Sequence, residues 1–361
     1  MLDKELRQIW IRNAILFGIA LIIKLLSLNS YWVEYYYSTN WYGRISHVLR
    51  IISSNIPFSI GDILYTWWVI WVLVICFDVI RALIRKTLTK RNFFLESSYN
   101  IKHLLRLYII FNLFWGLNYD REGIAAQLQL APGHYSTEEL QSITQDLLHK
   151  ANDARKKMGK NFQYPANKEM FEQAADAYDN VSSAYPFLNY RRPSVKRSLY
   201  SKLLTYMGYT GYYNPFTGEA QVNVIAPKFY LPFVTCHEIA HQVGYGDESE
   251  ANFVGYLAAS ASTENSVQYS AYIDLFTYAN GELFVRDSAA ARVNYKSLDT
   301  LVRKDLQEAR EFYRQYKNPV EPVIRFFYGA YLKANHQPHG IDTYDEVTGW
   351  LIAYKKKYGK I

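Results

Sequence analysis

The densest group of residues that could do chemistry is His237-Glu238-Ile239-Ala240-His241, an HExxH pattern. On an α-helix, positions i and i+4 lie on the same face, so both imidazoles can reach one metal ion. A zinc ion with three protein ligands keeps a fourth position for water, and a neighbouring glutamate can accept a proton from that water. The pattern therefore predicts zinc ligands at His237 and His241 and a general base at Glu238.

Two histidines do not complete a catalytic zinc site, and three acidic residues follow them closely: Asp247, Glu248 and Glu250. In one interpretation Gly244 turns the chain and Asp247 returns as the third ligand, which resembles the HExxHxxGxxD pattern of metzincin peptidases. In the other, Glu248 begins a second helix and binds the metal, which resembles gluzincin-type peptidases. Asn252, one turn later, could then hydrogen-bond a ligand histidine. We prefer Glu248 and keep Asp247 and Glu250 as alternatives.

The segment upstream of the HExxH pattern has strand character. It follows turn signals at residues 214–218 and precedes Pro227, and it consists of Ala220, Gln221, Val222, Asn223 and Val224. In similar peptidases an edge strand at this place aligns an extended peptide. We therefore expect this strand to pair with the main chain of a substrate.

Hydrolysis of a peptide also needs a donor for the charge that develops on the carbonyl oxygen. The carboxy-terminal segment YLKANHQPHGIDTY offers tyrosine and histidine side chains for this role. The candidate oxyanion donors are Tyr331, His336, His339 and Tyr344.

The composition indicates a membrane protein and disfavours two other classes. Hydrophobic residues make up 50% of the 361 residues and aromatic residues 17%, including 33 tyrosines, which suits interfacial aromatic belts. The net charge of +7 comes with no basic segment interleaved with stacking aromatics, so we expect no nucleic-acid partner. The two cysteines form no paired CxxC pattern, which excludes structural zinc fingers.

Three apolar segments dominate the first third of the chain, at residues 11–28, 60–83 and 103–118. A helix needs about 20 mostly apolar residues to span a bilayer, so the first two qualify. The third is shorter and carries Arg106 and Asn112. These segments predict a membrane domain over residues 1–118 with about three transmembrane helices, followed by a soluble domain over residues 119–361.

The distribution of basic residues predicts the orientation of these helices. Lysines and arginines cluster before or at the very start of the first segment, and from the end of the second to the start of the third, at Lys4, Arg7, Arg12, Arg81, Arg85, Lys86, Lys90, Arg91 and Lys102. The positive-inside rule places both regions in the cytoplasm. With three spans the carboxy-terminal domain is extracytoplasmic, and with two it is cytoplasmic. We favour three spans.

The soluble region is predicted to be mostly helical. Helical spacing of apolar residues, with charged residues on the opposite face, marks the ranges 138–158, 167–184, 250–277, 297–316, 320–335 and 344–358. Strand patterning is confined to the short region before the metal helix. We expect a mostly α fold with one small sheet.

The chain also resembles a known family. The segments FWGLNYDREG, NPFTGEAQVN and CHEIAHQVGYGDESEANF, together with the amino-terminal apolar helices, are similar to a bacterial membrane family catalogued as domain-of-unknown-function family 3810. The resemblance extends over most of the chain. It implies an α+β zincin-like (gluzincin-type) metallopeptidase domain on an inner-membrane protein, with no known substrate. The matching site positions are His237, Glu238, His241, Glu248, Glu250 and Asn252.

Together these patterns predict a multi-pass, membrane-anchored zinc metallopeptidase that hydrolyses peptide bonds with metal-activated water. Its partners would be the lipid bilayer and a peptide or protein substrate. The alternative is a non-catalytic metal-containing binding or sensing module at the cell envelope. Glu238 favours the enzyme, because a site that only binds metal needs no general base. A transporter is disfavoured because the apolar segments contain few paired ionisable groups.

Overall fold

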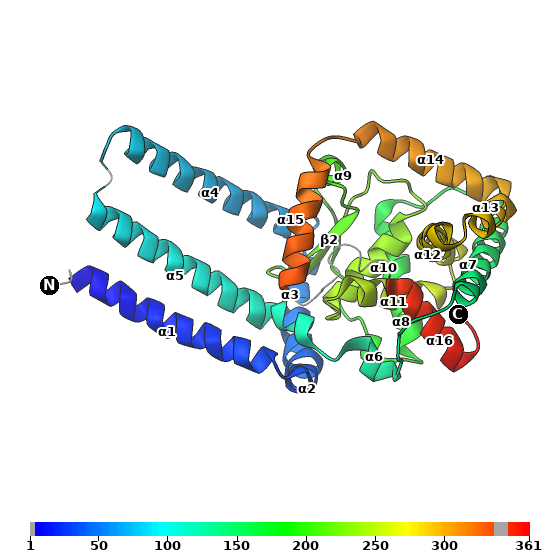
Figure 1. Ribbon diagram of the computed structural model, residues 1–361, viewed down its shortest axis with the longest axis horizontal. Coiled ribbons are helices and arrows are strands. Elements are labelled where there is room, and N and C mark those ends of the chain that lie inside the picture. Colours follow the sequence, from blue (N-terminus) through cyan, green and yellow to red (C-terminus); the bar gives the residue numbers. More distant parts are fainter. Residues whose placement is uncertain (1–3, 88, 336–345) are drawn as a thin grey trace.

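Three long helices extend from a mostly helical domain (Figure 1). The computed structural model of the protein describes residues 4–87, 89–335 and 346–361. The long helices are α1 (Lys4–Ser27), α4 (Ile60–Ile84) and α5 (Lys90–Phe114). All other elements belong to the connection between α1 and α4 or to the domain that follows α5.

Helices α1 and α4 are long and apolar enough to cross a membrane. Mean hydropathy over the most apolar 18 residues is 2.0 in α1 and 2.2 in α4. The third apolar segment, predicted at 103–118, lies in α5, which ends at Phe114. Arg106 and Asn112 interrupt its apolar run, and α5 is not among the membrane-length apolar helices of the described residues.

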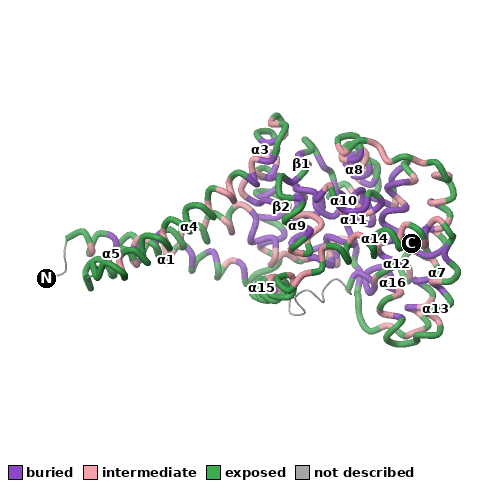
Figure 2. Tube along the Cα trace, turned by 90° about the horizontal axis from the view of Figure 1, so that it is seen from above, coloured by how far each residue is buried: buried purple, intermediate pink, exposed green. Residues whose placement is uncertain are grey.

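The three long helices differ in how they are packed. α1 lies along α5, and the Asn13 side chain donates to the Ser98 carbonyl at 2.9 Å. In α4 only Gly61 and Asp62 are buried, and the rest of this helix is half-buried or exposed (Figure 2). Beyond its first turn α4 also contacts the domain, where Tyr65 stacks on Tyr212 and Trp68 packs edge-on against Phe216.

Two carboxylates hold that first turn of α4. Glu219 accepts hydrogen bonds from the backbone amides of Ile60 at 3.1 Å and Gly61 at 2.6 Å. Asp62 accepts from the Leu199 amide at 2.7 Å and from the Tyr212 hydroxyl. A carboxylate at a helix amino terminus satisfies free amides and complements the helix dipole. The start of α4 is thus fixed to the sheet that borders the helix with the HExxH pattern.

The connection between α1 and α4 is helical, which the sequence patterns did not indicate. It comprises α2 (Ser30–Trp32), the π-helix η1 (Val33–Tyr42) and α3 (Gly43–Ser54). The hydroxyls of Tyr42 and Ser46 both donate to the Gln242 carbonyl at 2.9 Å. This segment therefore packs directly against the end of the helix that carries the HExxH pattern.

The domain core forms around two short helices, α10 (Leu231–Gln242) and α11 (Glu248–Ser260). The surrounding helices include α7 (Thr137–Met158), α8 (Asn167–Ser182) and α12 (Asn265–Arg286). Ser136 and Glu139 form a reciprocal capping box that starts α7. The predicted helices at 138–158 and 167–184 are confirmed, because their apolar residues face this core.

The small sheet has three strands in the order β1-β3-β2: β1 (Val195–Arg197), β3 (Glu219–Val222) and β2 (Gly211–Asn214). β3 pairs in parallel with β1 and antiparallel with β2, with Ala220 opposite Val195 and Tyr213. The strand expected at residues 220–224 is therefore the central strand and ends at Val222. The prediction of an edge strand there was wrong, because neighbours on both sides already use its backbone groups.

One helix that the sequence predicted as continuous is divided into two in the structure. Residues 250–277 were expected to be continuous, whereas α11 ends at Ser260 and α12 begins at Asn265. The Ser262 hydroxyl accepts from the Glu264 amide at 3.1 Å, and the Ser262 carbonyl accepts from Gln268 Nε2 at 2.7 Å. Such local side-chain bonds compete with the helical ladder and allow the chain to reverse.

The remaining described elements cover the core or join its parts. They are η2 (Gly116–Asp120), α6 (Gly123–Leu128), η3 (Pro186–Leu188), α9 (Ser201–Met207), α13 (Ser288–Ser297), α14 (Thr300–Tyr316), α15 (Glu321–Ala334) and α16 (Glu346–Tyr358). The helices expected at 297–316, 320–335 and 344–358 correspond to α14, α15 and α16. The mostly helical fold with a small sheet is confirmed.

Candidate metal centre

Helix α10 brings the HExxH side chains to one place. Pro232 lies in its first turn, where the missing amide costs no hydrogen bond. His237, Glu238 and His241 are all buried. The helix ends at Gln242, and its Val243–Gly244 turn leads directly to α11.

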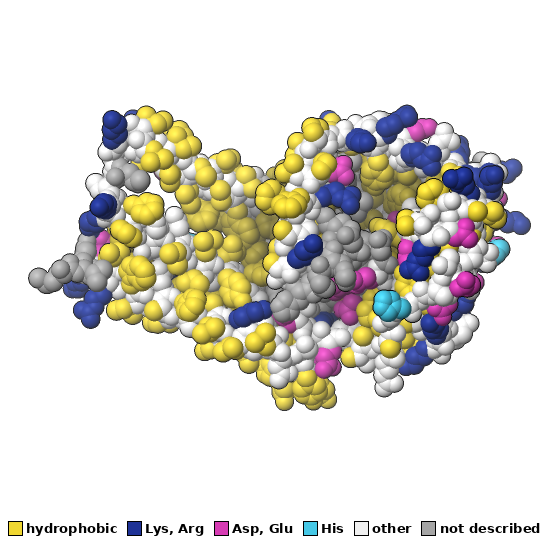
Figure 3. Space-filling view, viewed as in Figure 1, with side chains coloured by type: hydrophobic (Ala, Val, Ile, Leu, Met, Phe, Trp, Pro, Cys, Tyr) yellow, Lys and Arg dark blue, Asp and Glu magenta, His cyan; other side chains and the backbone are white. Residues whose placement is uncertain are grey.

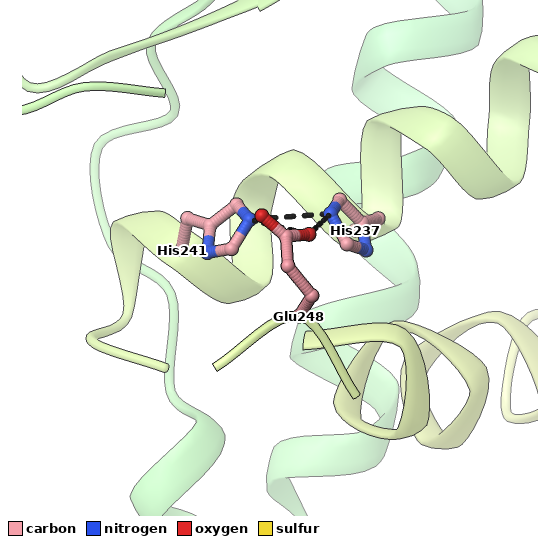
Figure 4. Close-up of side chains that lie close together, drawn as sticks. All are labelled: His237, His241 and Glu248. Carbon is pink, nitrogen blue, oxygen red and sulfur yellow. Dashed lines mark hydrogen bonds and ion pairs between the residues drawn. The ribbon is translucent and has the colours of Figure 1, made fainter. Parts of the chain in front are cut away.

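Helix α11 supplies Glu248 from its first residue (Figure 4). It crosses α10 closely at Gly255, where an added Cβ would lie 3.1 Å from the His237 backbone nitrogen. The crossing explains how Glu248 comes to face both histidines.

Three potential ligand atoms converge between these helices: His237 Nε2, His241 Nε2 and Glu248 Oε2. The two nitrogens are 3.1 Å apart, and the carboxylate oxygen is 3.2 Å from His237 and 3.7 Å from His241. Tetrahedral zinc with bonds of about 2.0–2.1 Å places its ligand atoms roughly 3.3 Å apart. Two imidazoles and one carboxylate are also a zinc ligand set, so both the donor chemistry and the spacing fit a zinc ion.

Two contacts orient the ligand side chains. His241 Nδ1 donates to the Tyr245 carbonyl at 2.7 Å, which leaves Nε2 free to bind a metal. The Tyr328 hydroxyl donates to Glu248 Oε1 at 2.6 Å and leaves Oε2 facing the histidines. Both contacts are of the kind that fixes metal ligands in place.

The hydrogen bond expected from Asn252 to a ligand histidine is not formed. Asn252 lies one turn after Glu248 and lines the same cavity. Its Nδ2 is buried without a partner among the described residues, as is His237 Nδ1. The prediction was wrong for His241 because the turn after α10 already supplies a backbone carbonyl to its ring.

The electrostatics of the centre favour an anionic Glu248 and leave Glu238 about half protonated near neutral pH. Burial opposes the charge of Glu248, but the hydrogen bonds and charges of His237 and His241 hold its pKa well below the ordinary range. Burial also opposes an imidazolium at His241, yet Glu248 raises its pKa to about 9. Burial raises the pKa of Glu238 to about 7 against the attraction of both histidines. A general base works best with a pKa near the operating pH.

The two alternative third ligands lie elsewhere. Asp247 Oδ1 accepts from the amides of Ser249 at 2.8 Å and Glu250 at 3.1 Å, so it caps α11. Glu250 points away from the histidines and accepts from the Ile124 amide at 2.9 Å. The metzincin-like arrangement, which needs Asp247 at the metal, does not match this geometry.

A cavity of about 940 Å³ opens from the three ligand side chains and Glu238. Strand β2 forms part of its wall, and a Cβ at Gly211 would lie 2.5 Å from Glu238 Oε1. β2 is an edge strand of the described sheet, so one of its sides is free to pair with the main chain of a substrate. β3 is central and has no such free side. Absence of a side chain at Gly211 allows the Glu238 carboxyl to lie against strand β2.

Of the four candidate oxyanion donors, only Tyr331 lies within the described residues. It lines the cavity, and its hydroxyl is 3.2 Å from that of Tyr119. His336, His339 and Tyr344 lie outside the described residues. The role of Tyr331 as an oxyanion donor stays a prediction.

A comparison with protein-family models matches residues 37–352, most of the chain, to the family described as "Protein of unknown function (DUF3810)". The chain belongs to this family. The matched range includes every residue of the metal centre. No curated protein and no solved structure matches the chain.

Sequence patterns missed two parts of the centre of this DUF3810 member. One is Tyr328, whose only signal was its place three residues before Tyr331 on the same helical face. The other is Arg121, which donates to Glu34 at 2.7 Å and to the Gly244 carbonyl at 2.9 Å. Arg121 also lies over the Tyr245 ring at 4.6 Å, so it holds the turn that orients His241. Glu34 and Arg121 are too far apart in sequence for any local pattern to pair them.

Tyr328→Phe is expected to weaken zinc binding about tenfold, as loss of a group that orients a metal ligand does. The substitution removes only the hydroxyl that bonds Glu248 Oε1. Zinc affinity would be measured by competition with a chelating dye. Tyr331→Phe is the matched control because its hydroxyl faces Tyr119, and equal affinities of the two variants would contradict a role for Tyr328.

Asp274→Asn is expected to raise the Tm of the chelated protein at pH 8 but not at pH 4. Burial raises the pKa of Asp274 to about 7, so its ionisation opposes folding as the pH rises from about 4 to about 7. At 1.36 kcal/mol per pKa unit, the variant gains at most about 4 kcal/mol in the free energy of unfolding. We expect its Tm to rise by a few degrees. Thermal unfolding at both pH values checks this, and an equal shift at both would refute it.

Proposed function

We propose that this protein is a membrane-anchored zinc metallopeptidase that hydrolyses peptide bonds. The observation that carries the proposal is the meeting of two imidazoles, one carboxylate and the separate Glu238 carboxyl at one cavity. Glu238 Oε2 is buried with no hydrogen-bond partner among the described residues. Burying an unpaired carboxyl costs stability, so a site that only stored metal would have no reason to keep one.

The residues present suit metal-assisted hydrolysis. Zinc, when bound by His237, His241 and Glu248, supplies a Lewis acid that polarises a carbonyl and makes water more acidic. Glu238 Oε2 accepts the proton of the attacking water and passes it to the nitrogen of the leaving amine. The edge strand β2 can align the main chain of an extended peptide beside that carboxyl.

The charges of the long helices support an extracytoplasmic location on the bacterial inner membrane. Arg91 and Glu5 form a 3.7 Å ion pair, so the first turns of α1 and α5 lie together. Arg81 and Arg85, at the end of α4, precede α5 by a short connection. Basic residues thus gather at the ends of the helices far from the metal centre (Figure 3). With α5 as a third span, the positive-inside rule places those ends in the cytoplasm and the domain outside.

The proposal is tested on the full chain in lipid vesicles. We expect about one zinc per chain, hydrolysis of members of a peptide library, loss of both on chelation, and recovery when zinc is restored. Metal content would be measured by elemental analysis and cleavage by mass spectrometry. Zinc-loaded protein that cleaves no peptide would overturn the proposal and favour a binding or sensing module.

A further inference from the structure

The cavity at the metal centre reaches the membrane helices. Its wall includes Tyr65, Val69 and Ile70 of α4 and Phe111 of α5, together with the metal-centre side chains. From Asp62 to Ile70 the cavity follows α4 for about 12 Å, at 1.5 Å per helical residue. One continuous space therefore joins the metal centre to the surfaces of the two long helices α4 and α5.

Those surfaces are apolar and uncovered. Val69 and Ile70 are 59% and 53% exposed, although both line the cavity. Hydrophobic side chains cover α4 and α5 and the hollow between them (Figure 3). A polar peptide would have to bury polar groups against such a wall, which costs free energy, whereas an apolar segment meets it without that cost.

The charges around the cavity select among apolar ligands. No lysine or arginine is among its described lining residues, and the charged groups there besides the histidines are the acids Asp62, Glu238, Glu248 and Asp274. Phosphate recognition normally uses cationic side chains, so phospholipid headgroups are poor ligands for this wall. An extended peptide, by contrast, can use the main chain of edge strand β2.

We infer that the cavity takes an apolar polypeptide segment directly from the lipid bilayer, between α4 and α5. This inference rests on the proposed peptidase function and names its substrate class. The substrate is a membrane-anchored protein whose cleavable bond directly adjoins its apolar span. The span enters beside Val69, and the extended residues next to it lie along β2 towards Glu238.

The test uses two peptides with the same cleavable sequence and the same span of about 20 apolar residues. In one the span directly follows the cleavable sequence, and in the other a Gly/Ser spacer of about 20 residues, roughly 25 Å in mean length, separates them. Both are equally concentrated at the membrane. Binding is measured by fluorescence transfer to full-length Glu238→Gln protein in vesicles, which separates recognition from hydrolysis.

We expect the directly linked peptide to bind at least tenfold more tightly than the spaced one. Val69→Trp, which narrows the cavity, should abolish this preference. Val74→Trp is the matched control because Val74 is a similarly exposed α4 residue, at 51%, that does not line the cavity.

Equal binding of the two peptides, or equal effects of the two tryptophans, would overturn the inference. So would displacement of the linked peptide by phosphatidylglycerol, which would make lipid the ligand. If the linked peptide binds as expected but wild-type zinc-loaded protein does not cleave it, the peptidase proposal fails while the binding inference stands.

Discussion

Glu238→Gln is expected to lower peptide hydrolysis by about 10²- to 10⁴-fold while zinc remains bound. The amide has nearly the shape of the carboxyl but cannot accept a proton from water. Glu238 is not among the three convergent ligand residues, so the metal should be retained. Because burial raises the pKa of Glu238 to about 7, wild-type activity should increase as the pH rises through that value, and the variant should lack this increase.

The measurement is kcat/KM for one cleaved peptide from pH 5.5 to 8.5, with zinc content determined on the same samples. Asp274→Asn is a useful control, since it removes another buried acid of the same cavity without touching the proposed base. If Glu238→Gln cleaves as fast as the wild type, Glu238 is not the base. If the variant also restores the function of a deletion strain fully, a binding or sensing role is favoured.

Glu248→Gln is expected to weaken zinc binding on the order of a thousandfold. Structural sites bind zinc with a free energy of about 10–16 kcal/mol. Losing the one anionic ligand among the three removes several kcal/mol of that binding free energy. Glu248 Oε2 is the only carboxylate oxygen in the convergent group of the described residues. An amide oxygen at that position lacks the charge that the two histidines face.

Glu250→Gln is the matched control for this loss. Burial, helped by the charge of Asp247, raises the pKa of Glu250 to about 8, so the group is mostly protonated at neutral pH and an amide imitates it. Zinc affinity should therefore be unchanged. Loss of zinc in Glu250→Gln with retention in Glu248→Gln would mean that the third ligand has been assigned to the wrong helix position.

Local sequence patterns were sufficient to predict an element wherever the pattern recurs within a few residues. HExxH places His237 and His241 on one helical face, and the apolar spacing of α7 and α8 predicted both helices closely. The break between α11 and α12 was missed because its stop signal is a pair of local bonds: the Ser262 hydroxyl accepts from the Glu264 amide, and the Ser262 carbonyl accepts from the Gln268 side chain. Side-chain competition of this kind does not alter hydrophobic periodicity.

Sequence by itself determined the pair of imidazoles, the adjacent carboxyl, the helical character of the domain and the two apolar helices. Tertiary structure alone decided which acid faces the histidines, because Asp247, Glu248 and Glu250 differ only in direction around the first turn of α11. It also decided that β2, not β3, is the strand at the cavity edge, and that Tyr328 and Arg121 support the centre. These last relations join residues from distant parts of the chain, and only packing fixes such distances.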